Sequence, residues 1–249
     1  MRSFKLAKYN IKSSLKSIII YYCIFTGAIT GIEILSKFSG GNGYSSGLEL
    51  SSIIFLFVLG LNSFKENFYF TQANNIPRVD YFRATAIAIL PIGLAMSILD
   101  VIINRVYNLF RICPTIYDMV YNHSFHLATN SEVWKQSNSI GTLLGTVTFL
   151  FAFYIVAFGV GVLITMIYYK CNKTMKILVS LSPIAIIVVC ERFAVNDPEF
   201  GEKVLIFIDN IFGISTKNSY RAVLTFICLF IISMFFVYIL VRKAVVKRV

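Results

Sequence analysis

The chain has 249 residues, of which 57% are hydrophobic and only 14% are charged, with a mean hydropathy of +0.74. A soluble domain carries roughly 25% charged residues, so the composition excludes a soluble globular protein. It predicts an all-α integral membrane protein in which residues 1–249 form a single transmembrane domain. The formal charge of +11 does not indicate nucleic-acid binding, because the positive charges are spread along the chain in a pattern typical of membrane orientation.

The chain begins with a basic segment, residues 2–16. Five basic side chains recur there at steps of three or four residues, with apolar side chains between them (Arg2, Lys5, Lys8, Lys12 and Lys16). This spacing predicts an amphipathic helix, residues 1–16, that lies on an anionic membrane surface. A plain positive flank before the first membrane span fits the same residues, and the sequence leaves both interpretations open.

Six apolar segments follow, and each has a length suited to a membrane-crossing helix, which needs about 20 residues. They cover approximately residues 17–36, 48–64, 83–106, 139–169, 175–192 and 220–241. Pro91 and Pro183 lie inside the third and fifth segments, where they predict kinks.

Charge predicts the orientation of these spans. With the N-terminus placed in the cytoplasm, the inner segments hold 15 of the 23 basic residues. Of the 12 acidic residues, only Glu66 and Asp80 lie on that side. Because cytoplasmic loops are enriched in Lys and Arg, the sequence predicts a multi-pass protein with both termini in the cytoplasm.

The connection between the second and third spans, residues 64–83, is rich in polar and aromatic side chains (FKENFYFTQANNIPRVDYFR). Its first half can form an amphipathic helix with Phe64 and Phe68 on one face. Asn74-Asn75 weakens that helix and Pro77 ends it. We therefore expect a short cytoplasmic helix at the membrane surface; an ordinary loop is the alternative.

Several ionisable side chains fall inside or at the ends of the predicted spans (Glu33, Asp100, Arg105, Glu191 and Arg192). Charges there are costly, so each is a functional candidate. Counting about 1.5 Å per residue from the inner ends places them in the outer leaflet. They predict an outer gate or a cation-binding site, or else acids that snorkel to the surface or pair with the two arginines.

Other motifs are weaker. The chain lacks a G-x-x-x-x-G-K-[ST] phosphate-binding motif, so ATP binding by this chain is not expected. His123 and His126 stand three residues apart without a third ligand, so no metal site is predicted.

An apolar patch in the outer loop 193–219 predicts an interfacial or re-entrant helix. Glycines in the fourth segment predict close helix approach (Gly141, Gly145, Gly159 and Gly161).

With these features together, the chain resembles an ABC-2-type transporter permease. The basic N-terminal segment resembles the elbow helix of that family, and six spans with both termini inside resemble its membrane domain. Segment 64–83 resembles its cytoplasmic coupling helix, and Asn75-Ile76-Pro77-Arg78-Val79-Asp80-Tyr81-Phe82 resembles the arginine-plus-aromatic exit from that helix. The resemblance implies contact with an ATPase for one set of residues: Lys65, Glu66, Phe68, Tyr69, Phe70, Arg78 and Asp80.

The resemblance also implies partners and a location. ATP and Mg would be bound by separate ABC-type ATPase subunits, with no cofactor or enzymatic activity in this chain. A second permease copy or a related permease would complete the membrane unit, in a bacterial plasma membrane. In such permeases the second and fifth spans border the central path, which here would be lined by Phe55, Phe57, Ile184 and Ile187. A path this apolar predicts export or flipping of an amphipathic or hydrophobic cargo, such as a membrane-active peptide.

Other classes of protein remain as alternatives. A secondary transporter should show internal repeats and broken midplane helices, but residues 1–110 and 139–249 show no convincing repeat and the sequence places no charged site at the midplane. A non-transporting membrane scaffold or sensor also fits six spans. A membrane-embedded enzyme is disfavoured, because no histidine or paired-carboxylate motif lies at the predicted inner surface.

Overall fold

The structure, a computed structural model, describes residues 2–38, 46–122, 136–242 and 244, and the regular elements in this part of the chain are all α-helices. Six helices are long and apolar enough to cross a membrane: α1 (Arg2–Phe38), α2 (Glu49–Ala73), α3 (Arg78–Tyr107), α6 (Ile140–Lys170), α7 (Lys173–Asn196) and α9 (Ser219–Arg242). Two shorter helices are α4 (Ile116–Tyr121) and α8 (Pro198–Phe212). The prediction of an all-α protein with six candidate membrane spans is therefore confirmed.

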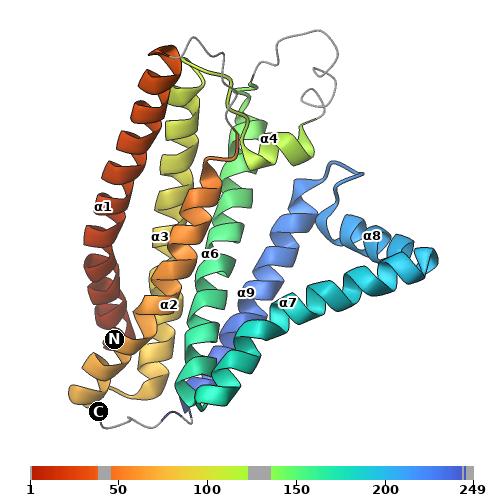
Figure 1. The fold of residues 1–249 in the computed structure, drawn as a ribbon. Coiled ribbons are helices and arrows are strands. Elements are labelled where there is room, and N and C mark those ends of the chain that lie inside the picture. Colours follow the sequence, from red (N-terminus) through yellow and green to blue (C-terminus); the bar gives the residue numbers. More distant parts are fainter. Residues whose placement is uncertain (1, 39–45, 123–135, 243, 245–249) are drawn as a thin grey trace.

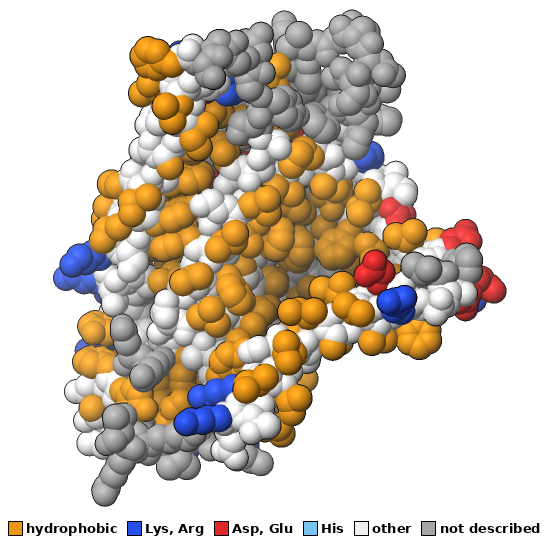
Figure 2. Space-filling view, viewed as in Figure 1, with side chains coloured by type: hydrophobic (Ala, Val, Ile, Leu, Met, Phe, Trp, Pro, Cys, Tyr) orange, Lys and Arg blue, Asp and Glu red, His pale blue; other side chains and the backbone are white. Residues whose placement is uncertain are grey.

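Five of the long helices form a bundle, and α7 diverges from it (Figure 1). Within the bundle α6 packs against α2, α3 and α9, and α1 packs against α3. α1 begins and α9 ends at the same end of the bundle, called here the terminal end (Figure 1). The opposite end holds α4 and the start of α2. Figure 2 shows apolar side chains over much of the face between the two ends, as expected for a surface in contact with lipid.

The central position of α6 follows from its sequence, which is apolar on all sides. A helix of this kind is normally buried, and α6 contributes fully buried side chains such as Leu150, Tyr154, Val162 and Met166. Ser139 begins the helix by accepting a hydrogen bond from the backbone N–H of Thr142.

Glycines allow α2 and α6 to approach closely. A Cβ atom on Gly161 would overlap the backbone oxygen of Phe57, and one on Gly60 would overlap the backbone oxygen of Phe158. Gly145 lies against the Tyr117 ring, whereas a Cβ on Gly141 would meet open space. The predicted close approach is therefore present at Gly161, but Gly141 takes no part in it.

Substitution of Gly161 by alanine is expected to lower the free energy of unfolding by about 1–3 kcal/mol, because the added methyl group would meet backbone atoms that cannot rotate away. Thermal unfolding of the purified chain in detergent measures this. The matched control is Gly141→Ala in the same helix, where the free space and the higher helix propensity of alanine should leave stability unchanged or slightly raised. Equal effects of both substitutions would contradict this description of the α2–α6 contact.

The structure differs from the sequence-based expectation at two helix boundaries. α1 runs without a break through Lys16, so residues 1–16 do not form a separate interfacial helix from Arg2 onward. α2 likewise continues from the span to Ala73, so the segment after Phe64 is the last part of a long helix. Neither junction contains Pro or Gly, and adding residues to an existing helix is favourable, whereas nucleating a new one is not.

The region after α7 contains a helix in the segment where the sequence predicted one. α8 is 15 residues long and includes the apolar patch expected to be helical. Asp197 caps it by accepting hydrogen bonds from the backbone of Glu199 and Phe200. Gly213 ends it with a φ of 64°, a left-handed conformation that favours glycine. The Ser215 backbone N–H donates a hydrogen bond to Asp209 Oδ1 (2.8 Å), which fixes the turn after α8. Hydrogen bonds from Ser215 also lower the pKa of Asp209.

Candidate functional site

A group of mostly buried polar side chains lies at the opposite end of the bundle, and we call it the polar cluster. α2, α3, α4 and α6 contribute to it, together with Gln136 before α6 (Glu49, Ser52, Asp100, Asn104, Arg105, Thr115, Asp118, Gln136 and Tyr154). Buried polar groups are costly unless they are paired, so the contacts of each member show how the cluster is stabilised.

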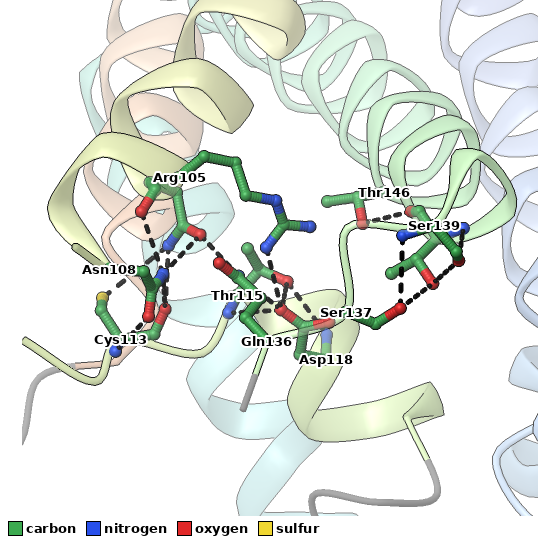
Figure 3. A network of polar contacts seen from close by, with 11 residues as sticks. Arg105, Asn108, Cys113, Thr115, Asp118, Gln136, Ser137, Ser139 and Thr146 are labelled. Atoms are coloured by element: carbon green, nitrogen blue, oxygen red, sulfur yellow. Dashed lines mark hydrogen bonds and ion pairs between the residues drawn. The ribbon is translucent and has the colours of Figure 1, made fainter. Parts of the chain in front are cut away.

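Asp118 is held by the start of α4 (Figure 3). Its Oδ2 atom accepts hydrogen bonds from the backbone N–H (3.2 Å) and the hydroxyl (2.8 Å) of Thr115, and the Thr115 hydroxyl accepts one from the Asp118 N–H (3.0 Å). This reciprocal arrangement is a capping box. Arg105 on α3 approaches the same carboxylate, with Nη1 3.9 Å from Oδ2.

Two further side chains join α3 to this region. The Gln136 amide donates hydrogen bonds to Asn104 Oδ1 (2.8 Å) and to Asp118 Oδ2 (3.0 Å). The Asn108 amide donates to the backbone oxygen of Cys113 (2.8 Å), and its Oδ1 accepts from the Cys113 N–H (2.8 Å) (Figure 3). These bonds fix the connection that carries the chain from α3 to α4.

Asp100 joins three helices. Its carboxylate accepts a hydrogen bond from the Tyr22 hydroxyl on α1 (2.9 Å) and another from the Tyr154 hydroxyl on α6. The aspartate is only 3% exposed, so the two tyrosines replace the water that it would otherwise bind.

Glu49, in the first turn of α2, is 1% exposed, and neither of its carboxylate oxygens has a hydrogen bond. It interacts electrostatically with Asp100 and Asp118 and with Arg105. The cluster thus buries three carboxyl groups beside one guanidinium, which suits binding of a proton or a cation. The described residues contain no group of three His, Cys, Asp or Glu side chains able to hold a metal ion.

The ionisable residues singled out in the sequence lie in three separate places. Glu33 forms an ion pair with Arg111 (Nε to Oε2, 3.4 Å) and accepts a hydrogen bond from Tyr107 (3.3 Å) at the end of the α1–α3 contact. Asp100 and Arg105 belong to the polar cluster. Glu191 and Arg192 are exposed on α7, outside the cluster. The structure therefore does not bring all five residues together, because α7 diverges from the bundle (Figure 1).

At the terminal end, the residues expected to contact an ATPase differ in exposure. The Phe68 side chain is fully buried and packs against Phe64, Tyr81 and Tyr169, with ring centroids 4.9, 5.6 and 6.2 Å away, so it is not exposed to a partner in this structure. Phe70, two residues further along α2, is 41% exposed and stacks on Tyr9 of α1, with ring centroids 4.8 Å apart.

The remaining members of that set have other positions. Tyr69 is half-buried. Lys65 and Glu66 lie within α2, and their side chains lie outside the described part of the structure. Asp80 accepts a hydrogen bond from the Ser3 hydroxyl (2.8 Å), and Arg78 donates one to the backbone oxygen of Arg242 (3.1 Å). These two contacts join the start of α3 to the start of α1 and the end of α9.

The residues expected to line a translocation path are not brought together. Phe55 stacks on Tyr21 of α1 at 4.2 Å, and Phe57 lies where α2 meets Gly161 of α6. Ile184 and Ile187 are 60% and 65% exposed on α7.

Apolar cavities instead lie between α1 and α3. One of about 480 Å³ is lined by Ile18, Pro91 and Leu99 among others. Its neighbour, of about 460 Å³, includes Glu33 and Lys37. Thr26 and Ile103 line both cavities, which makes them adjacent parts of one groove.

Sequence reasoning missed Glu49, Asp118 and the tyrosine partners of Asp100. Thr115-x-x-Asp118 has the spacing of a capping box and offered a usable signal. Glu49 stands at the edge of a predicted span and offered another. His123 and His126 lie outside the described residues. Comparison with protein-family models, with curated proteins and with solved structures finds no match for this chain.

Proposed function

We propose that this chain is the membrane-spanning subunit of an ABC-2-type exporter, driven by ATP hydrolysed in a separate subunit. The observation that carries the proposal is the exposed surface at the terminal end. There the stacked rings of Phe70 and Tyr9 stand beside the exposed turn at Asn74-Asn75. Exposed aromatic side chains of this kind often anchor protein–protein interfaces.

The shape of α2 supports a coupling role for this surface. The helix extends unbroken from Glu49 in the polar cluster to Ala73 at the terminal end. A partner that moves Phe70 therefore acts on the same helix that contributes Glu49 to the opposite end. This connection replaces the separate coupling helix expected from the sequence.

The groove between α1 and α3 supports an amphipathic or hydrophobic cargo. The cavity nearer the terminal end is lined by apolar side chains, and the cavity nearer the opposite end contains Glu33 and Lys37. A molecule with an apolar body and a polar end matches this distribution better than a sugar or a small ion, which needs polar groups along the whole route.

The coupling surface is tested by the double substitution Tyr9→Ala/Phe70→Ala. Loss of an aromatic anchor costs roughly 2 kcal/mol, so we expect about 30-fold weaker retention of the ATPase subunit. The tagged chain is purified from native membranes, and ABC-type ATPase subunits are quantified by mass spectrometry and nucleotide hydrolysis.

The matched control is Phe4→Ala, an aromatic side chain on α1 that is 68% exposed. It should leave retention unchanged. If the wild-type chain retains no ABC-type ATPase, or if the double variant retains as much as the wild type, the proposed coupling surface is rejected.

A secondary transporter is the second candidate, and the buried carboxyl groups of Glu49 and Asp100 favour it. The two functions predict opposite responses to energy source. Export that continues after ATP depletion and stops when the proton gradient is collapsed would identify the secondary transporter.

A further inference from the structure

Glu49 lacks the contacts that would stabilise a buried charge. Its side chain is 1% exposed and neither oxygen has a hydrogen-bond partner. The backbone of Glu49 itself and that of Ile116 at the start of α4 lie close enough to the carboxyl group to favour its charged form, but neither reaches hydrogen-bonding geometry. An ionised carboxylate without water or donors is far more costly to bury than a neutral carboxylic acid.

The charges around Glu49 favour the neutral form further. α3 presents Asp100 and Arg105, α4 presents Asp118, and α6 presents the Tyr154 hydroxyl. The single guanidinium already forms an ion pair with Asp118. A second and a third negative charge in the same buried region would therefore lack a compensating cation.

The other two acids have donors that Glu49 does not. Asp118 accepts hydrogen bonds from Thr115 and Gln136, and Asp100 accepts them from Tyr22 and Tyr154. These bonds replace part of the water that the two carboxyl groups lose on burial. Of the three carboxyl groups, Glu49 is the one with no hydrogen bond to either oxygen.

A proton also fits the available space. The two cavities between α1 and α3 are lined by other side chains, and one of these, Tyr22, donates a hydrogen bond to Asp100 of the polar cluster. The described residues include no metal-ligating group of three side chains. A proton needs neither a cavity nor further ligands.

We propose that Glu49 is a proton-binding site, which holds a proton while the opposite end of the bundle is packed and releases it when that end opens to water. Because the packed form holds one proton more than the open form, acid stabilises the packed form. This stabilisation is lost progressively as the pH rises above the ordinary pKa of a glutamate side chain, about 4.3. The proposal concerns this end of the bundle and is independent of what energises transport.

Cys113 provides a reporter of opening. It is fully buried in the connection between α3 and α4, next to the polar cluster. The full chain, with its other four cysteines replaced by alanine, is labelled in membrane vesicles with a water-soluble thiol reagent between about pH 5 and pH 9. The rate is divided by that of a reference thiol, Glu202→Cys on exposed α8, in a chain lacking the native cysteines.

We expect the corrected labelling rate to rise by up to about tenfold per pH unit, because one proton is released on opening. In Glu49→Gln, which mimics the protonated acid, the rate should stay at its low-pH value throughout. The control Glu33→Gln removes an acid that is ion-paired at the same end, and it should keep the wild-type slope.

Two results would overturn the proposal: a corrected rate independent of pH in the wild type, or a wild-type slope that persists in Glu49→Gln. If Glu49→Gln does not fold, infrared spectra of the wild type decide. The band of a protonated carboxylic acid should be present at neutral pH and disappear where the labelling rate stops rising with pH, because the packed form itself then loses its proton. Its absence at neutral pH rejects the proposal.

Discussion

Replacement of Phe68 by alanine is expected to lower the free energy of unfolding by about 3–5 kcal/mol. The Phe68 ring is fully buried where α2, α3 and α6 meet, between Tyr81 and Tyr169, and it stacks on Phe64 at 4.9 Å. Its removal would leave a cavity lined by large aromatic rings that cannot collapse into it without breaking their own contacts. Thermal or denaturant unfolding in detergent, followed by circular dichroism, measures the loss.

The control for this prediction is Phe70→Ala, two residues further along the same helix. Its ring is 41% exposed and stacks only on Tyr9 among the described aromatic rings. We expect its substitution to change stability by less than about 1 kcal/mol. A larger loss from Phe70→Ala than from Phe68→Ala would contradict the assignment of one ring to the core and the other to the surface.

The second large effect is expected from Arg105→Ala, at about 3–5 kcal/mol. Asp118 is fully buried, and Arg105 is the one basic side chain that forms an ion pair with it among the described residues. Removal of the guanidinium would leave the carboxylate in a low-dielectric region without a compensating charge. The measurement is the same unfolding transition.

Charge compensation can be separated from lost packing by a double variant. Arg105→Ala/Asp118→Asn removes both charges, so it should recover a substantial part of the stability lost in Arg105→Ala alone. Arg192→Ala on exposed α7 is the matched control and should change stability by less than about 0.5 kcal/mol. No recovery in the double variant would show that Arg105 acts through packing.

The membrane spans were predictable from the sequence because their signal is local. Each is a run of apolar residues whose length matches the hydrocarbon core, and α3, α6 and α9 were expected within a few residues of their observed bounds. The ends of α1 and α2 were not predictable in this way. A change from apolar to basic or polar composition marks where a helix leaves the membrane, but it does not break the backbone hydrogen bonding of that helix.

The polar cluster was predictable only in part, because its contacts join distant parts of the chain. Asp100 and Arg105 were recognised as ionisable residues within a predicted span. Their partners come from other helices: Tyr22 is 78 residues before Asp100 and Tyr154 is 54 residues after it. A tyrosine among 14 in an aromatic-rich chain carries no local sign that its hydroxyl meets a carboxylate.

The unbroken helix α1 has a mechanical consequence. Its 37 residues span about 55 Å, well beyond the hydrocarbon core of about 30 Å. It is fastened to α3 near both ends and between them, through Ser3–Asp80, Tyr22–Asp100 and the contact of Glu33 with Tyr107. We therefore expect α1 and α3 to move as one rigid unit. In the predicted orientation, a force on the cytoplasmic end of α1 would tilt the opposite end of this pair without being transmitted through the close contact between α2 and α6.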